Sequence, residues 1–319
     1  MMALSTYLHT SNNKITSLPS QPRHRPPILQ MIGNTPLLPL KNITRGIAPD
    51  VHVYVKAEWF NPGGSVKDRP ALRMIEQAEL RGDLRAGMTI IDATSGNTGI
   101  GYALVGAAKG YPVTLVMAEN VSEERKQIAK AYGANLIFSP GEEGADGAIR
   151  LVHKIVQANP RQYYHPNQYD NPDNWLAHFN STGPEIWRQT HGQITHFVTS
   201  VGTSGTFMGV GRYLKLQNPS IQLISVEPTD ADNAIEGVKH METAIVPKIF
   251  DPDLKDGEVR VTAAQAREMA QLLIKEEGLF VGFSAGAAVY SALQVARQLQ
   301  KGVVVTVLAD SGAKYASLL

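Results

Sequence analysis

The chain has 319 residues, of which 43% are hydrophobic and 18% charged, and its formal net charge is +1. This composition is typical of a globular protein long enough for two domains, it gives no reason to expect nucleic acid as a partner, and no apolar run approaches the roughly 20 residues that cross a membrane. The absence of cysteine excludes disulfides, thiolate metal sites and a cysteine nucleophile, and the scattered histidines argue against a metal centre.

Residues 1–29 are polar, contain no acidic side chain and end in a proline-rich run. Such acid-poor composition is also found in organelle transit peptides, but arginine is sparse here and no amphipathic repeat is evident. We therefore expect a flexible N-terminal arm over residues 1–29 and a cytoplasmic protein, with organelle targeting as the alternative.

From residue 50 onward, short β-rich runs alternate with helix-periodic runs. Strands are expected near 51–58, 88–93, 112–119, 135–140, 195–202, 221–228 and 303–310, and helices near 66–82, 97–110, 122–133, 144–160, 206–219, 262–278 and 286–302. Strands that are apolar on both faces and alternate with helices predict an α/β fold of mostly parallel, twisted sheets flanked by helices.

The stretch YYHPNQYDNPDNW, residues 163–175, interrupts this alternation and is the best candidate for a crossing between two domains. We expect a smaller N-terminal α/β domain over residues 60–171. A larger α/β domain would combine residues 30–59 with 172–319, including a long irregular stretch that ends near residue 260.

Lys67 stands directly behind a Pro-Gly-Gly turn, where a helix is expected to begin. A helix N-terminus disfavours a cation, so either this lysine points into water or its proton is easily lost. A neutral lysine can attack a carbonyl and form a Schiff base. Both interpretations stay open from this stretch alone.

Three loops follow predicted strands, where open α/β sheets bind their ligands. The first, residues 92–99, offers backbone N–H groups and the side chains of Thr94, Ser95, Asn97 and Thr98. It favours a carboxylate or phosphate site, with an ordinary capped turn as the alternative.

The second loop offers backbone amides and hydroxyls without bulk, which suit a phosphate monoester. Its residues are Gly202, Thr203, Ser204, Gly205 and Thr206. The lysine of a Walker loop is absent. A dinucleotide site, in which Glu227 would bind a ribose, is a competing interpretation. The glycine spacing argues against it, because it does not fit Gly-x-Gly-x-x-Gly.

The third loop contains Ser284 in a formal Gly-x-Ser-x-Gly pattern, Gly282 to Gly286. A hydrolase would need a histidine after this serine, but the last histidine is His240. Ser284 is therefore interpreted as a neutral hydrogen-bonding partner inside a pocket, or as a helix N-cap.

The motifs NPGGSVKDR, TSGNTG, NQYDNP, TGPEIW, GTSGT and GFSAGA, in this order, resemble those of the cysteine synthases (O-acetylserine sulfhydrylases), a family of pyridoxal-phosphate enzymes of fold type II. The resemblance covers about Met31 to Tyr315 and is closest to the type B isoform. It implies a two-domain enzyme that forms a homodimer.

The resemblance implies that Lys67 holds pyridoxal 5′-phosphate and later takes the substrate's α-proton. The phosphate would lie in the loop from Gly202 to Thr206, Asn97 would bind the phenolic oxygen, and Ser284 would face the pyridine nitrogen. The substrate carboxylate would be held by Thr94, Ser95, Thr98 and Gln168.

The implied reaction is β-replacement, in which O-acetylserine or O-phosphoserine loses its leaving group and a sulfur donor adds. Sulfide, thiosulfate or a carrier thiocarboxylate would give L-cysteine or S-sulfocysteine. Cystathionine β-synthase and serine or threonine dehydratase share the fold and stay open as alternatives. A cofactor-free binding or regulatory protein is the alternative from a different class, and a nicotinamide oxidoreductase is a more distant one.

The chain departs from the family pattern at Lys239 and His240, where type B-like enzymes carry arginine that can meet an anionic co-substrate. We expect Lys239 to bind substrate, although a lysine lacks the bidentate fork of arginine. The sequence also stops soon after Tyr315, which leaves C-terminal lid or interface contacts open. Expected partners are small molecules, with a serine acetyltransferase tail or a sulfur-carrier protein as candidates.

Overall fold

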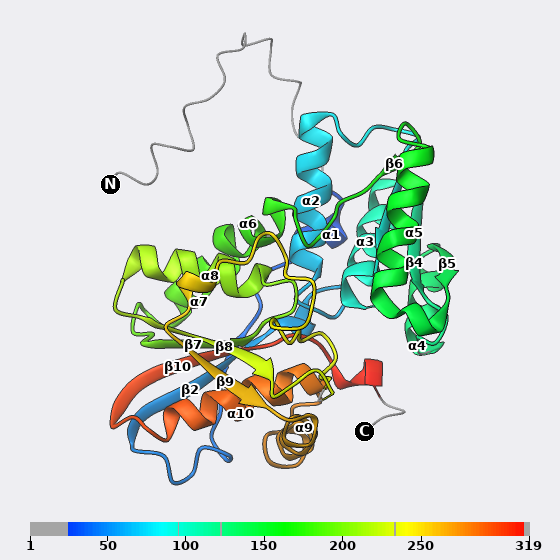
Figure 1. Cartoon of the computed structure of the whole chain (residues 1–319). Helices are drawn as coiled ribbons and strands as arrows, with labels where there is room; N and C mark the ends of the chain where they lie inside the picture. Colours follow the sequence, from blue (N-terminus) through cyan, green and yellow to red (C-terminus); the bar gives the residue numbers. More distant parts are fainter. Residues whose placement is uncertain (1–24, 95, 122, 233, 316–319) are drawn as a thin grey trace.

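The computed structural model describes residues 25–94, 96–121, 123–232 and 234–315. Their strands form two separate sheets flanked by helices, which confirms the predicted α/β class (Figure 1). Most of the predicted arm lies outside the described residues. Its last part does not match the prediction, because Pro27–Gln30 forms helix α1 and buries Leu29, so these residues belong to the folded body.

The smaller sheet has four parallel strands in the order β5-β4-β3-β6. The strands are β3 (Thr89–Ala93), β4 (Val113–Ala118), β5 (Asn135–Ser139) and β6 (Tyr163–Tyr164), and the accompanying helices are α2 (Asp68–Arg81), α3 (Asn97–Lys109), α4 (Glu123–Ala131) and α5 (Gly144–Ala158). Ile90 packs in the core that α2 and α3 share, whereas Ile91 packs against Val152 of α5 on the other face. Because helices cover both faces, every residue of β4 is buried.

The larger sheet has six strands in the order β1-β2-β10-β7-β8-β9, and only β1 runs antiparallel to its neighbour. The strands are β1 (Leu37–Pro39), β2 (Asp50–Ala57), β7 (His196–Ser200), β8 (Gln222–Pro228), β9 (Gly257–Val261) and β10 (Lys301–Leu308). Helices α6 (Pro172–Asn180), α7 (Thr182–Gln189) and α8 (Gly205–Gln217) lie on one side, and α9 (Ala263–Glu277) and α10 (Phe283–Ala296) on the other (Figure 1).

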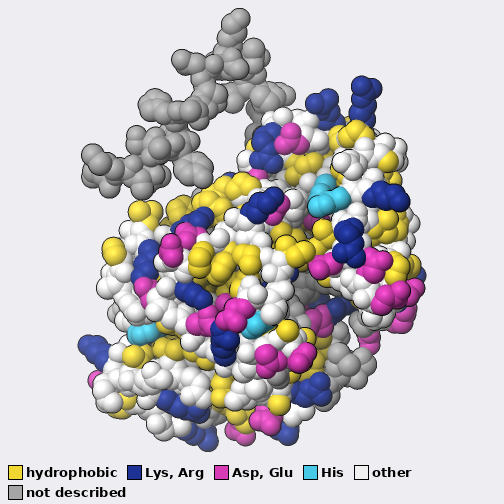
Figure 2. All heavy atoms as spheres, viewed as in Figure 1, with side chains coloured by type: hydrophobic (Ala, Val, Ile, Leu, Met, Phe, Trp, Pro, Cys, Tyr) yellow, Lys and Arg dark blue, Asp and Glu magenta, His cyan; other side chains and the backbone are white. Residues whose placement is uncertain are grey.

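Short 3₁₀ turns complete the described chain: η1 (Glu58–Phe60), η2 (Gly141–Glu143), η3 (Pro252–Leu254) and η4 (Gly312–Tyr315). On the face drawn in Figure 2, basic and acidic side chains are interspersed, in keeping with the near-zero net charge. None of the helices in the described ranges has the length and apolarity needed to cross a membrane.

The strongly periodic elements lie where the sequence predicts them, but six helices and strands of the described residues were not predicted: α1, β1, β6, β9, α6 and α7. Helix α6 begins inside the stretch that was expected only to cross between domains. Pro172 takes its first position, and Asn171 caps it by accepting a 2.9 Å hydrogen bond from the Asp173 amide.

The four-stranded sheet lies within residues 60–171, and the strands of the six-stranded sheet lie within residues 30–59 and 172–319. The arrangement is compatible with the predicted boundaries, and the division into domains itself stays a prediction.

Candidate active site

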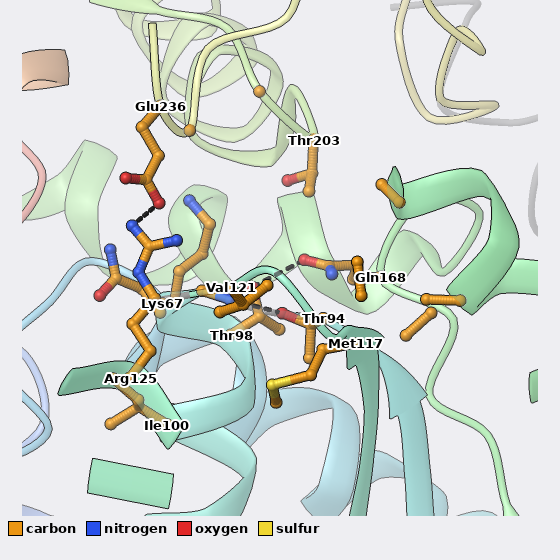
Figure 3. A pocket seen from close by; sticks show the side chains of 18 of the residues that line it. Lys67, Thr94, Thr98, Ile100, Met117, Val121, Arg125, Gln168, Thr203 and Glu236 are labelled. Atoms are coloured by element: carbon orange, nitrogen blue, oxygen red, sulfur yellow. Dashed lines mark hydrogen bonds and ion pairs between the residues drawn. The ribbon is translucent and has the colours of Figure 1, made fainter. Parts of the chain in front are cut away.

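A cavity of about 440 Å³ lies between the two sheets, where loops after β3, β7 and β10 meet. Figure 3 shows side chains that line it, among them Lys67, Thr94 and Thr203. The sequence-predicted residues that line it are Lys67, Thr94, Asn97, Thr98, Gln168, Gly202, Thr203, Lys239 and Ser284. Ser95, predicted to bind the same carboxylate as Thr94, lies outside the described residues. Residues from loops far apart in the sequence are thus brought to the carboxyl ends of parallel strands.

A smaller cavity of about 40 Å³ adjoins the first and is lined by the remaining predicted loop residues, Ser204, Gly205 and Thr206. Lys67 and Ser284 line both cavities. The two predicted loops therefore surround a continuous site, with the lysine where its parts meet.

Lys67 is the N-cap residue of α2, and no hydrogen bond joins its Nζ to any residue the structure describes. Burial is the main cause that lowers the pKa of Lys67, and the positive charge of Lys314 adds to it, while Asp310 and Glu58 oppose the shift. The helix terminus was expected to cause this shift, but desolvation dominates. The lowered pKa means that the Lys67 side chain loses its proton more easily than an exposed lysine does.

The loop before α8 has the features of an anion site. Ser204 adopts a left-handed conformation with φ of 67°, and its buried Oγ has no hydrogen-bond partner among the described residues. A side chain at Gly202 would overlap the carbonyl oxygen of Gly237, and one at Gly205 would overlap Asn174. The start of α8 adds free backbone N–H groups, so the loop suits a compact oxyanion.

Behind this loop, the Thr206 hydroxyl lies 3.3 Å from Nε2 of His178, whose Nδ1 lies 2.9 Å from Oγ1 of Thr182. Burial, helped by the charge of Arg69, lowers the pKa of His178 to about 3. The ring is therefore neutral at physiological pH and offers one donor and one acceptor. The sequence analysis did not identify it.

Gln168 is 4% exposed, and its Oε1 accepts a 2.7 Å hydrogen bond from Thr98 (Figure 3). Asn174 on α6 donates from Nδ2 to the Gln168 carbonyl at 2.6 Å and to Oγ1 of Thr203 at 3.0 Å. This asparagine, also missed from the sequence, ties the two predicted ligand loops together.

Two details of the sequence interpretation change. Ser284 is not the N-cap of α10, because Gly282 takes that position and Ser284 lies one residue inside the helix. Glu227, the candidate ribose ligand of the nicotinamide alternative, is buried and accepts a 3.0 Å hydrogen bond from the Met241 amide. It lines neither cavity.

The cavity also holds a hydrogen-bonded group around Asn97 that the sequence analysis missed. Nδ2 of Asn97 donates to Oδ2 of Asp310 at 2.7 Å, and Nζ of Lys314 donates to Oδ1 of Asn97 at 2.6 Å. The Tyr315 hydroxyl donates to the same Asp310 oxygen at 2.7 Å. Asp310 and Tyr315 are buried, and this group closes one wall of the site.

Further cations line the cavity mouth. Arg125 of α4 forms an ion pair with Glu236, which follows β8 (Figure 3). Nζ of Lys239 lies 4.9 Å from the Tyr169 ring centre, and burial lowers the pKa of Lys239. His240, in contrast, does not line the cavity. Within the described ranges, no cluster of side chains fit to hold a metal ion was found.

A family model described as pyridoxal-phosphate dependent enzyme matches residues 28–310. Cysteine synthase from Aquifex aeolicus is 52% identical over 296 residues, which cover 91% of this chain and 90% of that protein. Cysteine synthase B from Pseudomonas aeruginosa is 46% identical over 292 residues, which cover 92% of this chain and 96% of that protein.

Solved structures show the same similarity. O-acetylserine sulfhydrylase isoform 3 from Entamoeba histolytica matches with a TM-score of 0.86 and 37% identity, over 96% of this chain and 93% of that one. O-ureido-L-serine synthase also matches with a TM-score of 0.86 and 37% identity, over 92% of this chain and 93% of that one.

Proposed function

This chain belongs to the family of pyridoxal-phosphate dependent enzymes, and we propose that Lys67 is the residue that holds the cofactor. The enzyme is of the cysteine synthase type, which forms cysteine from an activated serine and a sulfur nucleophile. The observation that carries the role of Lys67 is its place at the junction of the two cavities. An amine there reaches both an anion site and an amino-acid site.

The residues of the smaller cavity fit the phosphate of pyridoxal 5′-phosphate, because the orphaned hydroxyl of Ser204 and the start of α8 supply donors. In our proposal Gly202–Thr206 hold this phosphate, Asn97 binds the phenolic oxygen, and Ser284 faces the pyridine nitrogen. When bound, the cofactor supplies an electron sink that stabilises negative charge at the substrate Cα.

The substrate carboxylate is assigned to Thr94, Ser95, Thr98 and Gln168. The hydrogen bond between Thr98 and Gln168 already holds two of these side chains together. Lys67, whose pKa is lowered by burial, would take the α-proton of the bound amino acid. Walls contributed by both sheets exclude water while the β-substituent leaves and sulfur adds.

The activated serine is O-acetylserine or O-phosphoserine, and the donor is sulfide, thiosulfate or a carrier thiocarboxylate. Lys239 gives the cavity positive charge that suits an anionic group on either substrate, whereas Glu236 balances the charge of Arg125. We assign Lys239 to this contact. Its ammonium has one described hydrogen bond, at 3.5 Å to the Ile245 carbonyl, which a ligand easily replaces.

We further propose that the enzyme works as a homodimer in the cytoplasm. A serine acetyltransferase tail or a sulfur-carrier protein is the candidate macromolecular partner. Light scattering of the purified protein tests the dimer, and a monomer at working concentration would contradict it.

The visible absorption spectrum tests the function most directly. The purified protein, supplied with pyridoxal phosphate, should show a visible absorption band that changes when O-acetylserine or O-phosphoserine is added separately, and Lys67→Ala should lack this band. The donor that changes the spectrum is the substrate. A cofactor-supplied wild type without any band would contradict the proposal and favour a binding protein.

The other candidate activities are not favoured. The similar sequences named above are cysteine synthases, rather than cystathionine β-synthases or dehydratases. Product analysis separates them, since a dehydratase would release a keto acid and ammonia from serine without any sulfur donor.

A further inference from the structure

Besides Lys67 and Lys239, Lys314 on turn η4 after β10 places an ammonium group in the active-site cavity. Its Nζ lies 2.6 Å from Oδ1 of Asn97, 3.1 Å from the Gly63 carbonyl oxygen and 3.3 Å from the Gly64 carbonyl oxygen. An ammonium has three donors, so these acceptors satisfy all of them. The side chain is thus held in place rather than free in solvent.

These contacts determine how the Asn97 amide is oriented. Oδ1 faces the Lys314 cation, and Nδ2 donates to the carboxylate of Asp310 at 2.7 Å. A flipped amide would turn its NH₂ toward an ammonium and its oxygen toward a carboxylate, and both contacts would be repulsive. The amide nitrogen carries two hydrogens, and Asp310 takes one. The other, which is also within reach of the Tyr315 hydroxyl, is the one that a ligand would meet.

The same C-terminal segment is joined to the chain just before Lys67. The Val66 amide donates to the Ala309 carbonyl at 2.8 Å, and Ser65 forms a β-bridge with Asp310. Lys314 adds the hydrogen bonds to the Pro-Gly-Gly turn. Asn97, on α3, is therefore linked through Lys314 to the turn that positions Lys67.

We propose that Lys314 is a positioning residue for the cofactor, which acts by fixing the Asn97 amide so that its second N–H meets the phenolic oxygen of pyridoxal phosphate. This rests on the proposed function, because it needs that cofactor in the cavity. The charge of Lys314 also contributes to lowering the pKa of Lys67.

Titration of the apoprotein with pyridoxal phosphate tests the proposal. Lys314→Met removes the charge and the donors at similar length and should weaken binding about tenfold, whereas Lys314→Arg should bind within a few-fold of wild type. Lys301→Met, at an exposed lysine that begins β10, is the matched control and should bind as wild type does.

A spectroscopic reading accompanies the affinity. The groups whose charges act on Lys67 are Asp310, Glu58 and Lys314. Without Lys314, only the two carboxylates act on Lys67, and both favour its protonated form. In Lys314→Met with bound pyridoxal phosphate, the midpoint of any absorbance change with pH should therefore move to higher pH. A purely structural role would lower the melting temperature without moving this midpoint.

A double-mutant cycle decides whether Lys314 acts through Asn97. Losses of affinity in Asn97→Ala and Lys314→Met should not add in the double variant. Additive losses, or unchanged affinity in Lys314→Met, would overturn the inference while the function stands. A wild type that binds no cofactor would overturn the function as well. Circular dichroism checks each fold, and Lys314→Gln takes the place of Lys314→Met should the latter not fold.

Discussion

Asn174 has little room to move, because it fills the space beside Gly205 and bonds to both ligand loops. A β-carbon at Gly205 would overlap its Oδ1. The glycine is therefore needed for packing as well as for access of an anion to the backbone. Displacement of Asn174 would disturb Thr203 and Gln168 together.

Gly205→Ala should accordingly weaken pyridoxal phosphate binding by about tenfold or more, while the protein stays folded. Gly141→Ala is the control, since a β-carbon there meets nothing closer than 3.4 Å. Apoprotein titration and melting temperature are measured for both. Affinity equal to wild type in Gly205→Ala would show that the loop can relax around the added methyl group.

Asp68, the neighbour of Lys67, predicts a pH dependence of stability. Burial raises its pKa to about 7 from 3.8, against the opposing effects of the Gly63 N–H and the Lys314 charge; Glu58 adds to the rise and Arg69 opposes it. Between these pH values the folded state keeps a proton that the unfolded chain has lost. The contribution of Asp68 to the free energy of unfolding thus falls as pH rises through this window and levels off above it.

Asp68→Asn should remove this fall, which is on the order of 2–4 kcal/mol. Urea unfolding at several pH values measures this change. As the control, Asp50→Asn at an exposed position should leave the dependence of the unfolding free energy on pH as in wild type. An unchanged slope in Asp68→Asn would assign the pH dependence to other groups.

Thr94 and Thr203 could be predicted from sequence because they lie in short loops after strands, and topology alone brings such loops together. Ser284 was also expected in such a loop, but it lies in α10, which follows α9 without a strand between them. Lys314, Arg125 and Glu236 gave no comparable signal. Their place in the cavity depends on how the C-terminal turn, α4 and the irregular loop after β8 pack, and charged residues in such segments usually face solvent.

Four elements meet at a buried ion network: β2, η1, α2 and α7. Arg69 pairs with Glu58 and with Glu185, each at 2.7 Å, and Lys56 pairs with Glu185 at 2.7 Å. Burial acts to raise the pKa of Glu58, but Arg69 and Lys56 lower it to about 2. The charges balance, and the loss of Glu185 would leave the buried Lys56 without its carboxylate and Arg69 with one carboxylate instead of two.

Glu185→Gln should therefore cost about 3–5 kcal/mol of unfolding free energy. Urea denaturation measures this loss. The control is Glu143→Gln, which breaks an exposed pair with Arg150 and should change stability by about 0.5 kcal/mol or less. A loss in Glu185→Gln no larger than in the control would mean that water enters the network.

Long elements with strong periodicity, such as β4 and α5, could be predicted from sequence because burial fixes their pattern. The missed elements have weak patterns for physical reasons. Strand β6 has two residues, and β9, at the sheet edge, is only partly buried. Helix α6 starts in a run of asparagine, aspartate and proline, which is typical of a loop. Only the structure shows that Asn171 in this run is the N-cap of a helix.

The two sheets are connected across the cavity mouth by the ion pair of Arg125 and Glu236, whose side chains are 14% and 35% exposed. Such a partly exposed pair contributes up to about 1 kcal/mol and weakens with salt. It holds α4 against the loop after β8, so it should slow the passage of ligands.

Glu236→Gln should speed the release of a carboxylate inhibitor by up to about five-fold, and added salt should then have little further effect. Stopped-flow fluorescence measures the rate. Glu123→Gln is the control, because this exposed carboxylate pairs with Lys126 within α4. Equal release rates in Glu236→Gln and wild type would show that the pair does not restrict the mouth.

Strand β10 carries a consequence for biosynthesis. It is the last strand of the described chain, yet it lies between β2 and β7 and pairs with β2 along its whole length, from Lys301↔Asp50 to Leu308↔Ala57. On the ribosome, the four-stranded sheet can assemble as soon as residue 164 has emerged. The six-stranded sheet cannot assemble at that stage, because β10, the partner of β2, is made only some 240 residues after β2. Until then the edge of β2 that pairs with β10 has no partner strand. Nascent chains arrested before β10 should therefore be bound by chaperones through the larger sheet, whereas the smaller sheet is already protected.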